Sequence, residues 1–258
     1  MLRPRIIPCL LIHNKGLVKT TKFLDPKYVG DPINAVRIFN EKLVDELIVF
    51  DIDATVEKRG PNFELIAKLA AECRMPFCYG GGVTKVEDVR KLVSLGVEKV
   101  AISNAAINNP EIIKKMVEEV GSQSIAIVLD VKKKLFGGYE VVTHNSKKGT
   151  GKNPVELASM FEKLEVGEII VNSVDNDGVM KGYDFKLIEK VREVTTTPLS
   201  VVGGAGSLSD ISDLISRFGI IGAVAGSLFV FKGVYKAVLI NYPSPESKKS
   251  LYENSLGS

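Results

Sequence analysis

Short apolar runs alternate with amphipathic stretches along the whole chain. The apolar runs are continuous, which is typical of parallel strands buried on both faces. Several of the amphipathic stretches open with Asp or Asn before a proline, a pattern that favours a helix start. Eight such pairs without a linker predict one α/β domain, a (β/α)8 or TIM barrel. The predicted strands are 5–12, 46–52, 76–80, 97–103, 124–130, 167–173, 198–202 and 221–226, and the predicted helices are 31–43, 61–74, 84–95, 110–120, 154–165, 184–195, 207–217 and 232–241.

The chain also repeats itself. The phrase VDELIVFDID at 44–53 returns as VGEIIVNSVD at 166–175, and Gly81-Gly82 returns as Gly203-Gly204 at the same offset. A chain built from two copies of a half, each with four strand–helix units, predicts a barrel with a two-fold half-barrel repeat. We expect the barrel to span 1–243 and a polar, loosely held tail to follow at 244–258.

Two segments, 12–30 and 131–153, are long for connections in a compact domain, and such loops are usually functional lids or disordered. Both follow strands, so both are expected on the C-terminal face, where barrel active sites form. Part of the second, 137–143, has the composition of a small hairpin. Basic residues gather in 13–27 and 132–152. They are either solvated loop positions or a surface that attracts a phosphorylated substrate.

Composition narrows the class of protein only slightly. The 258 residues are 45% hydrophobic and 25% charged, with a net charge of +3, too small to indicate a nucleic-acid partner. No run reaches the roughly 18 apolar residues that suggest a membrane span. The opening MLRPRIIPCLLI contains two prolines and predicts a first strand rather than a signal peptide. Three cysteines (Cys9, Cys73 and Cys78), an odd number without metal-site spacing, predict a cytoplasmic protein without a metal site. We also expect no cofactor.

The two glycine turns are candidate anion sites. Gly81-Gly82 follows the third predicted strand and Gly203-Gly204 follows the seventh, each just before a helix. Backbone N–H groups without side chains can approach an anion closely, and the following helix adds the positive end of its dipole. The ends of the neighbouring strands complete each site, with Ser103 and Asn104 beside the first turn and Gly226 and Ser227 beside the second. Either turn alone could be simple turn chemistry, but the pair predicts a ligand with two anionic groups.

Acids at strand ends are the second chemical signal. Asp130 ends a seven-residue apolar strand and is therefore expected at the barrel mouth, where a carboxylate can act as a general base, bind a hydroxyl group or be structural. Its counterpart in the first half of the chain is Leu11, which can neither accept nor donate a proton. Other acids at such ends are Asp51, Asp53, Asp175 and Asp177.

Several motifs carry a family resemblance, among them RIIPCL, VGDPINAV, VDELIVFDID, YGGGV, GSQSIAIVLDVK, GEIIVNSVDNDG and GGAGSL. Over about residues 3–235 the chain resembles the cyclase subunit of imidazole glycerol phosphate synthase. The resemblance implies a barrel that receives ammonia from a separate glutaminase subunit and that uses two catalytic aspartates. One of these aspartates matches Asp130, and the other falls on Leu11. Two further positions also depart from the family pattern, Asp53 and Val202.

The resemblance assigns roles to three groups of residues. Catalysis is assigned to Asp130, Lys19 and Asp51. Phosphate or substrate binding is assigned to Gly81, Gly82, Ser103, Asn104, Asp177, Gly178, Gly203, Gly204, Gly226 and Ser227. An ammonia gate at the N-terminal rim is assigned to Arg5, Glu46, Lys99 and Glu168, all present here. As four charges at strand starts, the last group could also be an exposed ring of ion pairs of little energetic value.

Segments 16–37 and 226–240 resemble a subgroup associated with glycosyl amidation in surface-polysaccharide (lipopolysaccharide) biosynthesis. We therefore expect a glutaminase-coupled synthase of lyase type that uses ammonia to form an amidine on a nucleotide-linked acetamido sugar. One alternative is the cyclase subunit of histidine biosynthesis, and a second is a non-catalytic scaffold that conducts ammonia. The expected partners are a glutaminase at the N-terminal face, a phosphorylated or nucleotide-linked sugar and an additional amidotransferase-like enzyme, with no nucleic acid and no membrane.

Overall fold

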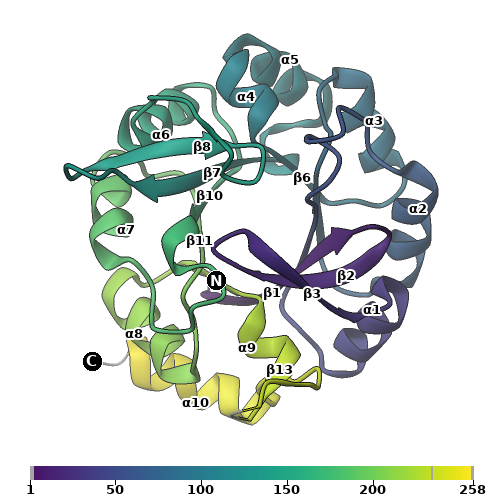
Figure 1. Ribbon diagram of the computed structural model, residues 1–258, viewed down its shortest axis with the longest axis vertical. Coiled ribbons are helices and arrows are strands. Elements are labelled where there is room, and N and C mark those ends of the chain that lie inside the picture. Colours follow the sequence, from purple (N-terminus) through teal and green to yellow (C-terminus); the bar gives the residue numbers. More distant parts are fainter. Residues whose placement is uncertain (1–2, 234, 257–258) are drawn as a thin grey trace.

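Eight parallel strands close into a barrel in the computed structural model, which describes residues 3–233 and 235–256 (Figure 1). Around the barrel the strands follow chain order, and the pairings of β1 with β12 and of β7 with β10 complete the circle. The predicted (β/α)8 class is confirmed. The barrel strands are β1 (Arg5–His13), β4 (Leu47–Asp51), β5 (Phe77–Gly80), β6 (Lys99–Ile102), β7 (Ile125–Lys133), β10 (Glu168–Ser173), β11 (Leu199–Val202) and β12 (Gly222–Ala225).

Helices surround the strands, and their start signals repeat between the two halves. Asp31 caps α1 by accepting a hydrogen bond from the Asn34 N–H, and Asn153, at the same offset in the second half, caps α6 through the Val155 N–H. Each cap precedes a proline in the first turn, where a missing N–H costs nothing. The helices of this layer are α1 (Pro32–Glu41), α2 (Phe63–Glu72), α3 (Val86–Ser94), α5 (Pro110–Val120), α6 (Pro154–Lys163), α7 (Phe185–Arg192) and α8 (Leu208–Phe218), with short α4 (Asn104–Asn108), α9 (Ser227–Val230), η1 (Ser122–Ser124) and η2 (Val174–Asn176) between them.

The predicted helix at 232–241 is wrong. The chain instead forms a small hairpin of β13 (Phe231–Lys232) and β14 (Ala237–Val238), because Gly233 and Lys236 take left-handed φ angles of 73° and 49° and reverse its direction. Position 234 of this prediction lies outside the described residues.

The last helix, α10 (Pro245–Leu256), lies in the segment expected as a tail. The expectation of loose attachment is not met for 245–256, because Lys248 and Tyr252 each donate a hydrogen bond of 2.8 Å to the buried carboxylate of Asp45. Residues 257–258 of the expected tail lie outside the described part of the chain.

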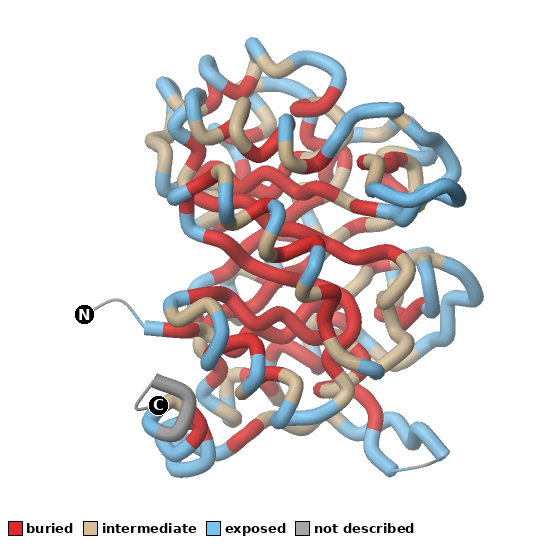
Figure 2. Tube along the Cα trace, turned by 90° about the vertical axis from the view of Figure 1, so that its left-hand side faces the viewer, coloured by how far each residue is buried: buried red, intermediate tan, exposed pale blue. Residues whose placement is uncertain are grey.

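The two long segments are hairpins that prolong barrel strands. β2 (Gly16–Thr21) folds back on β1 and pairs with β3 (Leu24–Gly30), while β8 (Tyr139–Thr143) folds back on β7 and pairs with β9 (Lys148–Gly149). Residues 139–143 of the hairpin considered for 137–143 form β8, which pairs antiparallel with β7 on one side and β9 on the other. Both rise from the carboxyl ends of barrel strands, on the same side as β13 and β14. Figure 2 shows exposed turns projecting from that side, with the buried strands in the middle of the molecule.

Side chains alternate between two apolar cores. On β1, Ile6 and Leu10 pack toward the helices, whereas Ile7 and Cys9 join a separate cluster inside the barrel. The inner cluster also contains Ile48, Cys78, Ala101, Ala126, Val128, Ile170, Val202 and Val224. Within residues 3–233 and 235–256, no helix combines the length and apolar character needed to cross a membrane.

Candidate functional site

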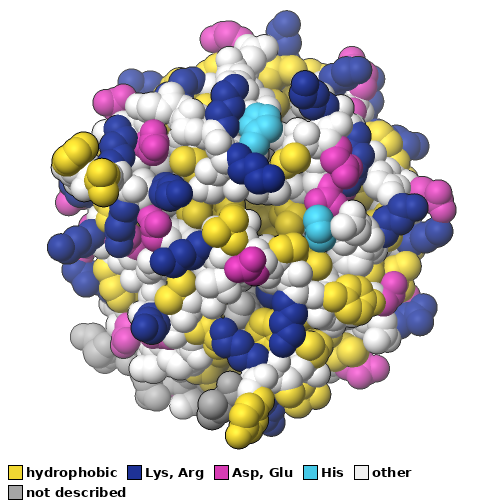
Figure 3. Space-filling view, viewed as in Figure 1, with side chains coloured by type: hydrophobic (Ala, Val, Ile, Leu, Met, Phe, Trp, Pro, Cys, Tyr) yellow, Lys and Arg dark blue, Asp and Glu magenta, His cyan; other side chains and the backbone are white. Residues whose placement is uncertain are grey.

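A cavity of about 520 Å³ opens at the carboxyl ends of the strands. Figure 3 views this face, on which lysine and arginine side chains surround a central hollow. Every residue predicted for catalysis or phosphate binding lines the cavity, whereas the four predicted gate residues do not. The topology therefore brings together groups that are more than 200 positions apart in the chain.

The two glycine turns lie on opposite sides of the cavity. One follows β5 beside β6 and the other follows β11 beside β12, and two strands separate these pairs in either direction around the barrel. Gly82 has φ 72° and Gly204 has φ 119°, a range that L side chains rarely adopt. A Cβ would come within 2.5 Å of the Arg59 carbonyl oxygen at Gly82 and within 2.1 Å of the Gly182 carbonyl oxygen at Gly204. Both turns therefore require glycine on geometric grounds.

Asp130 faces the cavity from β7 and is paired with a neighbour on β10. Asn172 donates a hydrogen bond of 3.0 Å from Nδ2 to Oδ1 of Asp130. Burial raises the pKa of Asp130 to about 7; the Asn172 hydrogen bond acts against this rise and the Asp177 carboxylate adds to it. A carboxyl group that titrates near neutral pH can both take up and release a proton.

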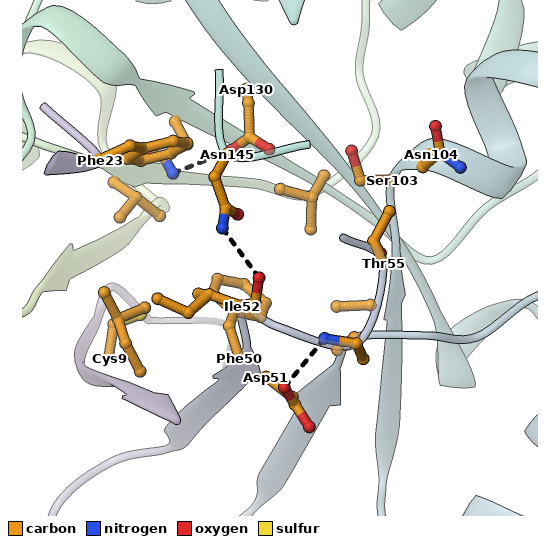
Figure 4. Close-up of a pocket in the computed structure, with 18 of the residues that line it drawn as sticks. Cys9, Phe23, Phe50, Asp51, Ile52, Thr55, Ser103, Asn104, Asp130 and Asn145 are labelled. Atoms are coloured by element: carbon orange, nitrogen blue, oxygen red, sulfur yellow. Dashed lines mark hydrogen bonds between the residues drawn. The ribbon is translucent and has the colours of Figure 1, made fainter. Parts of the chain in front are cut away.

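Leu11 lines the opposite wall. Leu11 on β1 lies opposite Phe50 on β4, and Asp130 on β7 lies opposite Asn172 on β10. Phe50 and Asn172 occupy equivalent positions of the internal repeat. Leu11 is therefore the structural counterpart of Asp130, as predicted from the sequence. Figure 4 shows Asp130 on one side of the cavity and Phe50 on the other. Asp130 and Asn172 thus form a polar pair on one wall, and Leu11 and Phe50 form an apolar pair on the opposite wall.

The β2–β3 hairpin carries Lys19 into the cavity. Lys19 is buried, its Nζ donates a hydrogen bond to the carbonyl oxygen of Cys9, and burial lowers its pKa. The same hairpin is tied to the loop after β10, because the Thr20 hydroxyl and the Phe23 N–H donate to Asp177 at 2.8 and 3.3 Å. Burial raises the pKa of Asp177 as well. The hairpin therefore closes over one side of the mouth.

Asp51 is fully engaged by its neighbours. Arg59 donates to both carboxylate oxygens at 2.8 and 2.9 Å, and the N–H groups of Asp53 and Ala54 donate to Oδ1. A bidentate guanidinium–carboxylate pair fixes geometry. Here it holds the loop after β4 that borders the first glycine turn. Asp53 in turn contacts Nδ1 of His13 at 2.6 Å.

The four predicted gate residues form a closed ring at the other end of the barrel. Arg5 donates to Glu46 and, at 2.7 Å, to Glu168, while Lys99 donates to Glu46 at 2.9 Å and to Glu168 at 2.7 Å. The two carboxylates are almost fully buried and the two cations are partly exposed. Ser200 also donates to Glu168. The ring lies at strand starts, so the apolar cluster inside the barrel separates it from the cavity.

Sequence reasoning missed several residues that line the cavity, notably Phe23, Arg59, Asn145 and Asn172. Asn145 lies at the turn between β8 and β9, and its side-chain amide donates to the Ile52 carbonyl oxygen at 2.9 Å, which ties that turn across the mouth (Figure 4). The internal repeat could have indicated Asn172, because its counterpart Phe50 directly precedes Asp51. No comparable signal marks Asn145.

Comparison with known proteins gives consistent matches over nearly the whole chain. The family model described as "Histidine biosynthesis protein" matches residues 5–236. A Vibrio vulnificus protein provisionally named imidazole glycerol phosphate synthase subunit hisF3 is 53% identical, with 98% of each chain covered. A Pseudomonas aeruginosa protein provisionally named subunit hisF2 is 50% identical, with 94% of this chain and 97% of the relative covered. The imidazole glycerol phosphate synthase subunit HisF of Dictyoglomus thermophilum is 37% identical, with 99% and 98% covered.

Proposed function

We propose a function on the premise that the chain belongs to the histidine biosynthesis protein family and, within it, to the HisF type of imidazole glycerol phosphate synthase subunit. The chain is the ammonia-using synthase subunit of a glutamine-dependent complex. A glutaminase subunit binds the end of the barrel that carries the ion-pair ring, and ammonia travels through the lumen to a phosphorylated substrate in the cavity. The names of the relatives favour the cyclase reaction of histidine biosynthesis over the amidation that segments 16–37 and 226–240 suggested.

One observation carries this proposal: the ring and the reaction cavity lie at opposite ends of the apolar cluster inside the barrel. Two positive and two negative side chains close the ring, so it carries no net charge. The lumen above it is lined by Ile, Val, Ala and Cys side chains, which do not compete for a small neutral molecule. Such a path suits ammonia better than ammonium, because an unpaired charge is costly to bury in apolar surroundings.

The cavity residues then have distinct roles. The turns at Gly81-Gly82 and Gly203-Gly204 hold the two phosphate groups of the substrate, one on each side of the mouth. Asp130 exchanges protons with the reacting atoms, since its pKa of about 7 leaves both of its forms populated at neutral pH. Lys19 closes over the substrate with its hairpin. Asp51 acts through Arg59 to position the first glycine turn, because both of its oxygens are already occupied.

A second candidate remains, favoured by the apolar pair Leu11 and Phe50. The family reaction, as the resemblance implies, uses an aspartate at the position of Leu11, and no carboxylate takes its place here in the register. With one proton-transferring acid, the cavity suits the amidation of a nucleotide-linked acetamido sugar, helped by an additional amidotransferase-like enzyme. The adjoining phosphates of such a substrate form one diphosphate, which would occupy one of the two glycine turns.

Turnover with ammonium salts decides between these candidates. The purified barrel is supplied with ammonium chloride and either the ribulosyl intermediate of the histidine pathway or a nucleotide-linked acetamido sugar. Product from the ribulosyl compound supports the cyclase. Tight binding of the sugar without ribulosyl turnover supports amidation. Absence of binding and turnover with both compounds, while the chain still stimulates the glutaminase, would leave only an ammonia-conducting scaffold.

Asp130→Asn is the companion variant. It should abolish turnover in either enzymatic role while leaving glutaminase stimulation intact. Full product formation by this variant would remove Asp130 from the reaction.

A further inference from the structure

Only one of the two polar atoms in the Asn172 carboxamide forms a hydrogen bond among the described residues. Its Nδ2 donates to Asp130, and its Oδ1 is buried without a hydrogen-bond partner among the described residues. The residue as a whole is only 6% exposed. A buried acceptor that makes no hydrogen bond costs about 1–3 kcal/mol, so such an atom calls for a ligand or a mechanistic explanation.

The position of the free oxygen is well defined. A Cβ placed on Gly203 would lie 3.4 Å from Asn172 Oδ1, so this atom is turned toward the second glycine turn while the amide nitrogen faces Asp130. Asn172 therefore bridges the acid and one of the two anion cradles. The bond to Asp130 uses Oδ1 of that carboxyl group, which leaves Oδ2 outside this interaction.

Strand β10 links this atom to the ion-pair ring. Glu168, Ile170 and Asn172 alternate along the strand, so all three project to the same side of the sheet, the inside of the barrel. Glu168 belongs to the ring, Ile170 to the inner apolar cluster and Asn172 to the cavity wall. Four residues at about 3.3 Å each place the free oxygen roughly 13 Å along the strand from the ring.

We propose that Asn172 and Asp130 together form the receiving site for ammonia, an inference that rests on the proposed function. Oδ1 of Asn172 and the carboxylate of Asp130 accept two N–H bonds of the ammonia molecule, which leaves its lone pair directed into the cavity. A small molecule fits this place better than a substituent of the substrate, because Asn172 is almost wholly buried and lies at the lumen side of the cavity.

Asp130 carries the protons that the reaction moves from nitrogen to oxygen. The nitrogen lone pair forms a C–N bond to a substrate carbon that carries a carbonyl oxygen, and that oxygen takes up the electrons of the C=O π bond. The positively charged nitrogen releases one proton to the Asp130 carboxylate. The Asp130 carboxyl returns this proton to the oxygen, which becomes a hydroxyl group. As the C–O bond breaks, the nitrogen lone pair forms a C=N bond and a second proton passes from the nitrogen to the hydroxyl group through Asp130, so that water leaves and the Asp130 carboxylate is restored. No oxidant, reductant or cofactor is needed.

Valine and threonine at position 172 provide a matched pair of tests. Both side chains are β-branched and suit a strand, and they differ in one hydroxyl that can donate to Asp130 and accept an N–H. In turnover with ammonium chloride, Asn172→Val should raise KM for ammonium between about threefold and tenfold, the value of one hydrogen bond, and Asn172→Thr by much less. KM for the phosphorylated substrate should stay unchanged in both. Equal KM values for ammonium in the two variants would overturn the receiving site.

A titration without substrate separates this inference from the proposed function. With 13C-labelled aspartate, and with the Asp130 signal assigned through Asp130→Asn, the pKa of Asp130 should rise in Asn172→Val, because the amide donor that favours the ionised form is lost. Asn172→Thr should keep the wild-type value, and Phe50→Leu, at the equivalent position of the other half-barrel, should not change it. If neither candidate substrate turns over but Asn172→Val raises the pKa, the pairing stands and the proposed function fails. An unchanged pKa in Asn172→Val would refute the pairing itself.

Discussion

Asp130→Asn should make the folded protein more stable at alkaline pH. In the folded chain burial raises the pKa of Asp130 to about 7, with an opposing effect from Asn172 and a reinforcing one from Asp177, whereas an unfolded aspartate titrates near 3.9. Because the folded pKa is the higher one, this carboxyl group favours folding fully below about pH 3.9, and the contribution is lost as the pH rises to about 7. Three pKa units correspond to about 4 kcal/mol. The Asp130 side chain is partly exposed to the cavity, so screening by water reduces the expected effect to about 2 kcal/mol.

Urea denaturation between pH 4.5 and 8.5 measures this effect. The free energy of unfolding of the variant should exceed that of wild type by about 2 kcal/mol at pH 8.5, and most of the difference should vanish at pH 4.5.

Asp45→Asn is the control, for which the change in stability has the opposite sign. Burial would raise the pKa of Asp45, but hydrogen bonds from the Ile6 N–H, Lys248 and Tyr252 hold this pKa below its usual value. Its carboxylate therefore stabilises the fold above about pH 3.9, and its loss should destabilise the protein at pH 8.5. A stability difference for Asp130→Asn that is negative, or constant with pH, would refute the raised pKa and with it the acid–base assignment.

Three further changes test other parts of the structure. Glu168→Gln removes one buried carboxylate from the ring and leaves Arg5 and Lys99 to share Glu46. The free energy of unfolding in urea should therefore fall by about 2 kcal/mol. The control Glu64→Gln, in an exposed pair with Lys68, should leave the free energy of unfolding unchanged. Gly204→Ala should weaken binding of pyrophosphate at least tenfold, because the added Cβ would overlap the Gly182 carbonyl oxygen. Gly219 also has a positive φ, but no atom lies within 4 Å of a Cβ added there. Gly219→Ala should therefore leave pyrophosphate binding unchanged in the same titration. Tyr252→Phe removes one hydrogen bond to Asp45 and should lower the free energy of unfolding by about 1 kcal/mol, and an unchanged melting temperature would show that α10 does not depend on this contact.

The fold was predictable where the sequence pattern and the local physics agree. Continuous apolar strands and Asp-Pro or Asn-Pro helix starts are local signals, and they predicted the strands and seven of the helices. The helix α10 carries little such signal: Leu251 is its one buried apolar side chain among those described, and its anchor is a polar contact between Lys248 and Asp45. A pairing across about 200 residues cannot be inferred from the pattern of either segment. Conversely, 232–241 has helical apolar spacing, but two left-handed positions make it a hairpin.

Much the same distinction applies to the candidate site. Glycine turns and strand-terminal acids are placed by the barrel topology alone, so their convergence on one cavity was predictable. The sequence could not predict which of these acids is hydrogen-bonded to neighbouring side chains and which is left to react. Sequence patterns do not show that Arg59 donates to both oxygens of Asp51, a residue predicted for catalysis. They also do not show which side chain the strand adjacent to Asp130 presents to it.

The unlike walls of the mouth have a stereochemical consequence. A ligand stretched between the two glycine turns presents one flank to Asp130 and Asn172 and the other to Leu11 and Phe50. Nitrogen can then add to the planar carbonyl carbon from a single side, so the tetrahedral adduct that precedes the loss of water should form as one hand wherever that carbon is a stereocentre. Placing an acid at position 11 alone would set it beside a phenyl ring with no amide to orient it; equal reactivity from both flanks would require Leu11→Asp and Phe50→Asn together.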